Sequence, residues 1–119
     1  MQVLVVDDSQ IMRKILTGAL NKVGINDTLD ACDGKEAVQI VSENSDIGLV
    51  LMDWNMPNMT GLEAIRKIRA SKNSVPIIMC TTEGEKEKVL EALKSGASDY
   101  LVKPFSPKDI QAKLEKYIR

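Results

Sequence analysis

The stretch Leu49-Val50-Leu51-Met52-Asp53 is a continuous apolar run that ends in an aspartate. Similar apolar runs occupy residues 3–6 and 77–80, and residues 28–31 and 100–102 are weaker strand candidates. Because the strong runs are continuous rather than alternating, they are typical of strands buried on both faces of a parallel sheet. Such a sheet must be covered on both sides by other elements.

Helical periodicity fills the intervals between these runs. Apolar residues recur at helical spacing within residues 11–23, 37–41, 62–68, 89–93 and 110–118. Residues 33–36, 60–63 and 82–85 resemble capping boxes, and Pro107 suits a first helical position. Gly24 and Gly96 suit helix ends. Alternating strands and helices predict one α/β domain over residues 1–119, a doubly wound, five-stranded parallel sheet with five helices.

The composition restricts the chemistry that the chain can perform. It has 119 residues, of which 44% are hydrophobic and 28% charged, and a formal net charge of −1. This balance does not favour nucleic acid or an anionic membrane as a partner. The chain contains no histidine, which excludes Ser-His-Asp and Cys-His nucleophiles, histidine-ligated zinc and a phosphohistidine carrier.

The N-terminal stretch and the two cysteines bear on the cellular compartment. No apolar run approaches the ~18 residues of a membrane span. The first residues lack the basic segment of a signal peptide. Cys32 and Cys80 are far apart in sequence and fit free thiols in a reducing compartment. We therefore expect a cytoplasmic protein.

Polar side chains follow four of the predicted strands at the point where each strand ends. Asp7 and Asp8 follow the first strand, Asp53 the third, Thr81 the fourth and Lys103 the fifth. The carboxyl ends of parallel strands meet at one edge of the sheet, where doubly wound proteins bind their ligands. We therefore expect three carboxylates, a hydroxyl and an ammonium group in one crevice.

Crowded carboxylates repel one another, so either their pKa values rise or a cation lies among them. At an effective dielectric constant near 20, two like charges ~4 Å apart cost about 4 kcal/mol. A cation can neutralise them, and a few oxygen ligands without His or Cys favour Mg²⁺ over Ca²⁺. A metal and a lysine beside Asp53 also suit phosphoryl transfer with the carboxylate as nucleophile. No glycine-rich nucleotide-binding loop is present, so the phosphoryl group is expected from another molecule.

Each of these residues, taken alone, also fits a structural role. The pair Asp7-Asp8 and Asp53 could form turns or helix caps, Thr81 could be ordinary strand sequence, and Lys103-Pro104 could be a turn. The functional interpretation is favoured because four separate strand ends together supply what one phosphoryl reaction needs.

At these residues the sequence resembles the CheY-like receiver domain of two-component response regulators. The resemblance covers essentially the whole chain. It is carried by Asp7-Asp8, by the pattern D-x-x-x-P-x-x-x-G that runs from Asp53 through Pro57 to Gly61, by Thr81, and by residues 96–105. It implies a flavodoxin-like fold with strand order 2-1-3-4-5 and a cis peptide bond between Lys103 and Pro104.

The resemblance also implies a role for each site residue. Asp53 accepts a phosphoryl group from a CheA-like histidine kinase as an acyl phosphate. Asp8, the Asp53 carboxylate and the Asn55 main-chain carbonyl ligate one Mg²⁺ ion, for which Mn²⁺ can substitute, and Asp7 assists through water. Lys103 pairs with Asp53 and then with the phosphoryl oxygen.

A second group of residues is implied to respond to the phosphoryl group. Thr81 bonds to it and draws its loop inward, and Tyr100 changes rotamer as the loop moves. Asn55 and Glu83 tune the acyl phosphate lifetime, and this pair predicts rapid self-dephosphorylation. The fourth helix, fifth strand and fifth helix then bind a target such as the flagellar motor switch protein. A phosphatase is a further implied partner, and the chain is expected to be a monomeric switch rather than an enzyme.

Other classes of protein stay open at this point. An aspartate-nucleophile phosphatase of the haloacid dehalogenase type carries D-x-D on its first strand, whereas here the acids are adjacent and the nucleophile follows the third strand. A receiver of another phosphorelay, stand-alone or excised from a longer regulator, fits the same residues. An FMN-binding flavodoxin lacks support, because no phosphate-binding loop follows the first strand and Asp7-Asp8 would repel a phosphate.

Overall fold

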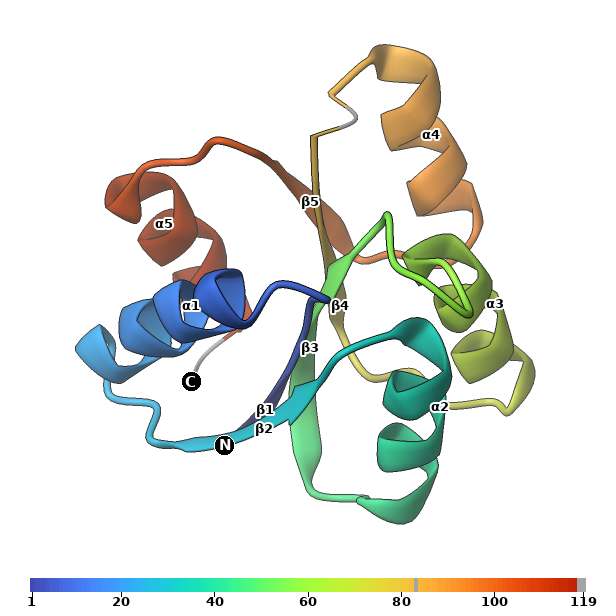
Figure 1. The fold of residues 1–119 in the computed structure, drawn as a ribbon, viewed down its shortest axis with the longest axis horizontal. Coiled ribbons are helices and arrows are strands. Elements are labelled where there is room, and N and C mark those ends of the chain that lie inside the picture. The colour runs from blue at the N-terminus through green and yellow to red at the C-terminus, as the bar shows by residue number, and fades with distance from the viewer. Residues whose placement is uncertain (83, 118–119) are drawn as a thin grey trace.

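The computed structural model of the chain, described for residues 1–82 and 84–117, contains five strands that alternate with five helices (Figure 1). The strands are β1 (Gln2–Val6), β2 (Asp27–Ala31), β3 (Ile47–Asp53), β4 (Ile77–Thr81) and β5 (Asp99–Val102). The helices are α1 (Gln10–Lys22), α2 (Gly34–Glu43), α3 (Gly61–Ala70), α4 (Lys86–Lys94) and α5 (Pro107–Tyr117). The predicted α/β class is confirmed. Residue 118 of the predicted fifth helix lies outside the described residues.

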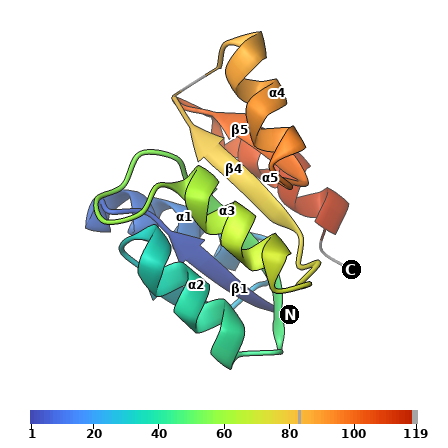
Figure 2. The same ribbon diagram turned by 90° about the vertical axis from the view of Figure 1, so that its right-hand side faces the viewer.

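All strands are parallel, and the sheet has the order β2-β1-β3-β4-β5. Helices α1 and α5 cover one face, and α2, α3 and α4 cover the other (Figures 1 and 2). The predicted strand order is therefore confirmed. The order places β1 and β3 side by side at the centre of the sheet.

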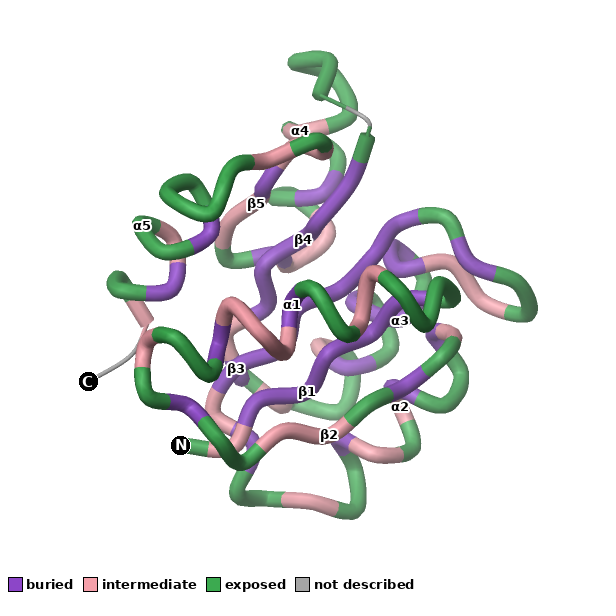
Figure 3. The backbone as a smooth tube through the Cα atoms, turned by 60° about the vertical axis from the view of Figure 1, so that its left-hand side comes forward, coloured by how far each residue is buried: buried purple, intermediate pink, exposed green. Residues whose placement is uncertain are grey.

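The continuous apolar runs are explained by a core on each side of the sheet. Leu4 and Met52 pack toward α2 and α3, whereas Val5 and Leu51 pack with the apolar side chains of α1 and α5. Successive strand residues point to opposite faces, so a strand covered on both faces needs an apolar residue at every position. Figure 3 shows β1, β3 and β4 as mostly buried segments, with exposed residues recurring along the helices around them.

Two predicted apolar stripes are only partly buried. In α1, Leu16 and Leu20 are buried, but Ile11 and Ile15 are 75% and 52% exposed. In α4, Ala92 is the one buried residue, and Leu90 and Leu93 are 44% and 38% exposed. The physical reason is that helical spacing predicts which residues share a face, but not how much of that face the sheet covers.

Of the three predicted capping boxes, one is confirmed in full and one in part. Thr60 and Glu63 form a complete capping box at the start of α3, and the Asp33 side chain accepts a hydrogen bond from the Glu36 N–H at the start of α2. The predicted box at residues 82–85 is wrong. Because α4 begins only at Lys86, its cap position falls on residue 85, which makes no side-chain capping bond.

Two smaller predictions about the backbone, and the prediction of free thiols, are also confirmed. Gly24 and Gly96, after α1 and α4, have φ values of 90° and 117°, which glycine adopts without steric cost. The Lys103–Pro104 peptide bond is cis. Cys32 and Cys80 are both free thiols. Among the helices of residues 1–82 and 84–117, none combines the length and apolar character that crossing a membrane requires.

Candidate functional site

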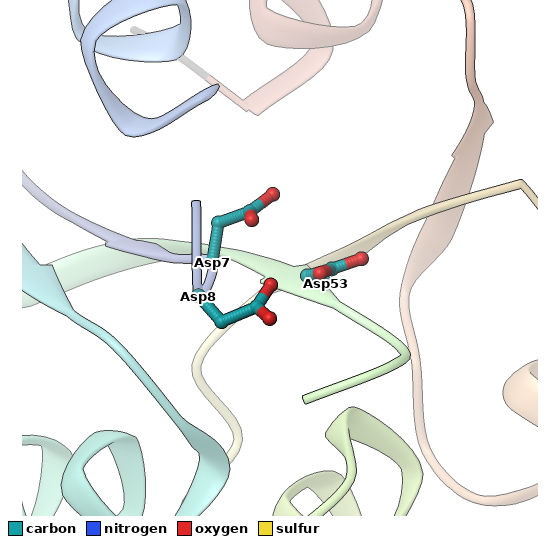
Figure 4. A group of neighbouring side chains, drawn as sticks. All are labelled: Asp7, Asp8 and Asp53. Carbon is teal, nitrogen blue, oxygen red and sulfur yellow. The ribbon is translucent and has the colours of Figure 1, made fainter. Parts of the chain in front are cut away.

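Three carboxylates lie together at the carboxyl edge of the sheet (Figure 4). One oxygen from each of Asp7, Asp8 and Asp53 lies within 4.8 Å of the others. The pairing of β1 with β3 explains the convergence, since Val6 is the partner of Met52 and the next residue of each chain segment is an aspartate. Asp7 and Asp53 are only 2% and 7% exposed, whereas Asp8 is exposed.

Lys103 connects two of these carboxylates. Its Nζ donates to Asp7 Oδ2 at 3.0 Å and to Asp53 Oδ1 at 3.1 Å, and its side chain is 15% exposed. The sequence prediction included the pair with Asp53 but missed the pair with Asp7. No sequence signal distinguishes the two acids as lysine partners, because the contact depends on how far the lysine side chain reaches across the sheet.

Burial and charge act in opposite directions on the pKa values of Asp53 and Lys103. Desolvation raises the pKa of Asp53 above its ordinary value, and the Asp7 charge adds to this effect, although Lys103 opposes it. For Lys103, burial favours the neutral form, but the hydrogen bonds and charges of Asp7 and Asp53 outweigh it and raise its pKa. Lys103 is therefore an ammonium ion at neutral pH.

The donor set fits a hard divalent cation. When all groups are ionised, three carboxylates face one ammonium, which leaves an excess of negative charge that a divalent ion can neutralise. The donors are oxygens only, which Mg²⁺ prefers to the imidazole and thiolate ligands of zinc. The acids Asp7, Asp8 and Asp53 are those that the sequence predicted for Mg²⁺. Asn55 lies exposed in the loop after β3, and its role as a carbonyl ligand stays a prediction.

The loop after Asp53 is held by backbone hydrogen bonds. The Trp54 N–H donates to Asp53 Oδ1 at 2.9 Å, and the Gly61 N–H donates to the Trp54 carbonyl at 2.8 Å. A Cβ atom at Gly61 would lie 2.0 Å from the Asp53 carbonyl oxygen. The glycine in the pattern D-x-x-x-P-x-x-x-G therefore has a steric reason, since only a residue without a side chain allows this close approach.

Replacing Gly61 with alanine is expected to lower the free energy of unfolding by about 2–3 kcal/mol, because the methyl group collides with rigid backbone at Asp53. Gly18→Ala is the matched control, since a Cβ at Gly18 in α1 meets nothing within 4 Å. That variant should gain about 0.5–1 kcal/mol from reduced backbone entropy. Urea denaturation measures both, and equal effects would contradict the steric explanation.

The same loop is tied to the start of α2. Asn58 has a φ of 68°, and its Nδ2 donates to Asp33 Oδ2 at 2.8 Å. The Gly34 N–H donates to the Met59 carbonyl at 3.2 Å. The pKa of Asp33 is lowered, mainly by the hydrogen bond from the Glu36 N–H and then by that from Asn58. The loop that begins at the acid cluster is thus fixed at both ends.

The two predicted switch residues lie at different places. Thr81 is the last residue of β4 and is buried. It lies beside the site because the preceding residue, Cys80, pairs with Asp53 in the sheet. Tyr100 lies within β5, away from the acid cluster, and is partly buried against the core. The Lys113 Nζ lies 5.2 Å from the centroid of the Tyr100 ring. Glu83, predicted to tune the acyl phosphate lifetime, lies outside the described residues.

Helix α4 contacts the residue next to Asp53. The Lys88 Nζ lies 5.7 Å from the centroid of the Trp54 ring, a cation–π distance. Trp54 is the single tryptophan of the chain and is 7% exposed. Its fluorescence should therefore report on changes at the acid cluster and at the start of α4.

Comparisons with known proteins agree with this geometry. Residues 3–115 match the family described as response regulator receiver domain. The chain is 48% identical over 117 residues to the "Chemotaxis protein CheY homolog" of Campylobacter jejuni, covering 97% of this chain and 90% of that protein. It is 46% identical over 117 residues to the "Chemotaxis protein CheY1" of Helicobacter pylori strain J99, covering 97% and 94%.

Solved structures show the same similarity. The receiver domain of the Francisella response regulator 1452 superimposes with a TM-score of 0.90 at 32% identity, covering 98% of this chain and 94% of that one. The chemotaxis response regulator CheY4 of Vibrio cholerae superimposes with a TM-score of 0.89 at 34% identity, covering 98% of both chains.

Proposed function

The chain belongs to the response regulator receiver domain family, and from this membership we propose that it is a phosphorylation-dependent switch of the chemotaxis type. In this proposal Asp53 accepts a phosphoryl group from a histidine kinase in a Mg²⁺-dependent reaction. The observation that carries the proposal is the convergence of Asp7, Asp8 and Asp53 at one edge, with Lys103 bonded to two of them. Residues 1–119 would form a single receiver domain.

The chemistry follows from the position of each group. A carboxylate oxygen of Asp53 attacks phosphorus, the phosphorus–nitrogen bond of the phosphohistidine breaks, and the imidazole leaves with its electron pair. Asp8, Asp53 and the Asn55 carbonyl would hold Mg²⁺, and Asp7 would assist through water. The bound ion would neutralise negative charge on the oxygens of the transferred phosphoryl group. The Lys103 ammonium, 3.1 Å from Asp53 Oδ1, lies where it can pair with the new phosphoryl oxygens.

The output step is a shift between two arrangements of the β4–α4 and β5 region. Converting a population that is mostly inactive to one that is mostly active takes about 5.5 kcal/mol of differential stabilisation. Hydrogen bonds of the phosphoryl group to Lys103 and Thr81, at ~1.5–3 kcal/mol each, are of the required size. The contact of Lys88 with Trp54 supports a path from the acid cluster to α4. The surface of α4, β5 and α5, with Tyr100, would then bind a target such as a flagellar motor switch protein.

The chemotaxis role is favoured over the alternatives. The Campylobacter and Helicobacter relatives named for chemotaxis are matched over 90–94% of their own length. A haloacid dehalogenase-type phosphatase would carry its nucleophile on the first strand, whereas Asp53 ends β3. The fine details, including rapid self-dephosphorylation through Asn55 and Glu83 and the action of a separate phosphatase, belong to the proposal.

Trp54 fluorescence tests the proposed function. The protein is titrated with Mg²⁺ and then with beryllofluoride, a phosphoryl mimic, as wild type and as Asp53→Asn. We expect saturable quenching in the wild type and loss of the beryllofluoride step in the variant, because the amide cannot form the acyl phosphate analogue. Equal responses in both proteins, or a response in neither, would remove the support for Asp53.

The exposed isoleucines of α1 predict where the kinase docks. Ile11 lies in the first turn of α1, which begins two residues after Asp8, and is 75% exposed. Ile11→Ser is expected to slow phosphotransfer from a phosphorylated chemotaxis histidine kinase by about tenfold, since burying an isoleucine contributes roughly 1.5–3 kcal/mol. The rate with acetyl phosphate should be unchanged, because a small donor needs no docking surface.

Leu90→Ser is the control for this experiment, because Leu90 is also an exposed aliphatic residue but lies on α4. Its phosphotransfer rate from the kinase should equal that of the wild type. If Ile11→Ser slows both donors alike, the isoleucine acts on the site itself and the docking prediction is wrong.

A further inference from the structure

The acidic pair lies on a turn between β1 and α1 that has its own hydrogen bonds. The Asp7 N–H donates to the Ala31 carbonyl at 3.1 Å, and the Ser9 N–H donates to Asp7 Oδ1 at 2.9 Å. The Asp7 carbonyl oxygen accepts a hydrogen bond from Arg13 Nη1 at 2.6 Å. This last bond fixes the peptide group that joins Asp7 to Asp8.

Arg13 is itself held at several points. It lies in the first turn of α1, and its N–H donates to the Ser9 carbonyl at 3.0 Å. Its Nε donates to Asp30 Oδ2 on β2 at 3.2 Å, and its side chain is 16% exposed. The planar guanidinium donates in two directions at once, which the single ammonium of a lysine cannot reproduce with the same geometry.

The position of the Asp8 carboxylate depends on the hydrogen bonds of Arg13 more than the positions of the other two acids do. Asp7 and Asp53 are buried and bonded to Lys103. The Asp8 carboxylate is exposed, and within residues 1–82 and 84–117 no hydrogen bond or ion pair holds it. The backbone of the turn therefore sets the position of the Asp8 Cα and the direction in which its side chain leaves the chain.

We propose that Arg13 is a positioning residue for the cation site. By holding the Asp7 carbonyl, Arg13 orients the Asp7–Asp8 peptide group so that the Asp8 carboxylate faces Asp53. The carboxylates of Asp8 and Asp53 are then preorganised to bind a divalent ion. The inference rests on the proposed Mg²⁺ role of the cluster. It assigns a specific part in cation affinity to Arg13, whose side chain bonds to the Asp7 main-chain carbonyl and to Asp30 rather than to the clustered carboxylates.

A purely electrostatic effect of Arg13 has the opposite sign. The guanidinium carries positive charge next to the site, so its removal would strengthen Mg²⁺ binding if charge were its only influence. Loss of positioning weakens binding, because Asp8 must then be ordered when the ion arrives. The direction of the change in Kd therefore separates the two explanations.

The test measures the Kd of Mg²⁺ by Trp54 fluorescence for the wild type, Arg13→Lys and Arg13→Met. We expect both variants to bind Mg²⁺ about tenfold more weakly, the lower end of what residues supporting metal ligands contribute. Arg13→Lys is decisive, since it keeps the charge and loses the two-way donation. Lys14→Met, at an exposed position next to Arg13, is the control for charge loss and should bind as tightly as the wild type or slightly tighter.

A thermodynamic cycle with Asp8→Asn tests whether Arg13 acts through Asp8. In the Asp8→Asn background, Arg13→Lys should have no further effect on the Kd, whereas a general structural role would persist there. Urea denaturation without Mg²⁺ shows that each compared variant is folded, and if Arg13→Met is not, Arg13→Lys carries the test.

The outcomes distinguish the inference from the proposed function. Unchanged or tighter Mg²⁺ binding in Arg13→Lys, or an undiminished effect in the Asp8→Asn background, would overturn the positioning role. Absence of Mg²⁺ binding in the wild type would overturn the proposed function instead. Normal binding in the wild type that is unaffected by Asp8→Asn would overturn the role of Asp8, and the inference with it.

Discussion

Replacing Asp53 with asparagine is expected to reduce phosphoryl incorporation from a small phosphodonor and Mg²⁺ by at least about a hundredfold. The amide is nearly the same size as the carboxylate but is not a nucleophile, and covalent catalysis requires the attacking group. The loop should stay in place, because Oδ1 of an asparagine can still accept from the Trp54 N–H. Intact-protein mass spectrometry measures the incorporated group.

Asp109→Asn is the matched control for this experiment, since Asp109 is an exposed aspartate on α5 that contacts none of the three clustered acids. Its incorporation should equal that of the wild type. Undiminished incorporation in Asp53→Asn would place the phosphoryl group elsewhere and contradict the assignment of the nucleophile.

The Asp53→Asn variant should also be more stable than the wild type at neutral pH without Mg²⁺. Burial raises the pKa of Asp53, so in the pH range above the ordinary aspartate value of about 3.9 the folded state binds more protons than the unfolded state. Stability is then lost as the pH rises through that range, because folding must bury a charge. Asparagine removes this cost, and Lys103 keeps Asp7 as a partner. Urea denaturation at several pH values should show the pH dependence weakened in the variant.

The fold and the acids of the site could be predicted because burial leaves a direct record in the sequence. A strand covered on both faces needs an unbroken apolar run, as at residues 49–52, and the aspartate that follows marks the end of the strand. The adjacency of β1 and β3, which brings Asp7 next to Asp53, depends on the order of the strands, and the resemblance to receiver domains supplied that order.

The remaining features depend on distances that no pattern in the sequence records. The bond from Lys103 to Asp7 requires the lysine to reach from the end of β5 to that of β1. The exposure of Ile11 depends on how much of the surface of α1 the sheet covers, and the start of α4 depends on the path of the preceding loop. Arg13 resembles any helical surface arginine until the turn at Asp7 is folded against it.

Lys103→Met is expected to lower the free energy of unfolding by about 3 kcal/mol at neutral pH without Mg²⁺. Removing one partner of a buried ion pair leaves an uncompensated charge, which typically costs about 3–5 kcal/mol. Here two buried carboxylates, Asp7 and Asp53, lose the same ammonium. Methionine retains an unbranched side chain of similar length, so the packing of the stem is largely preserved. Lys108→Met, at an exposed lysine of α5, is the matched control and should leave stability nearly unchanged.

If Lys103 stabilises the fold through its charge, two further results are expected for the Lys103→Met protein. Its stability deficit should shrink as the pH falls, because the Lys103 charge no longer lowers the pKa of Asp53, and protonation of Asp53 removes its repulsion with Asp7. The deficit should also shrink when Mg²⁺ is added, because a divalent ion supplies the positive charge that the lysine provided, and stabilisation grows with its concentration. Urea denaturation as a function of pH and Mg²⁺ measures both effects. A deficit that is constant across pH and unaffected by Mg²⁺ would mean that Lys103 stabilises the fold through its hydrocarbon stem, and that the acids are not held together by its charge.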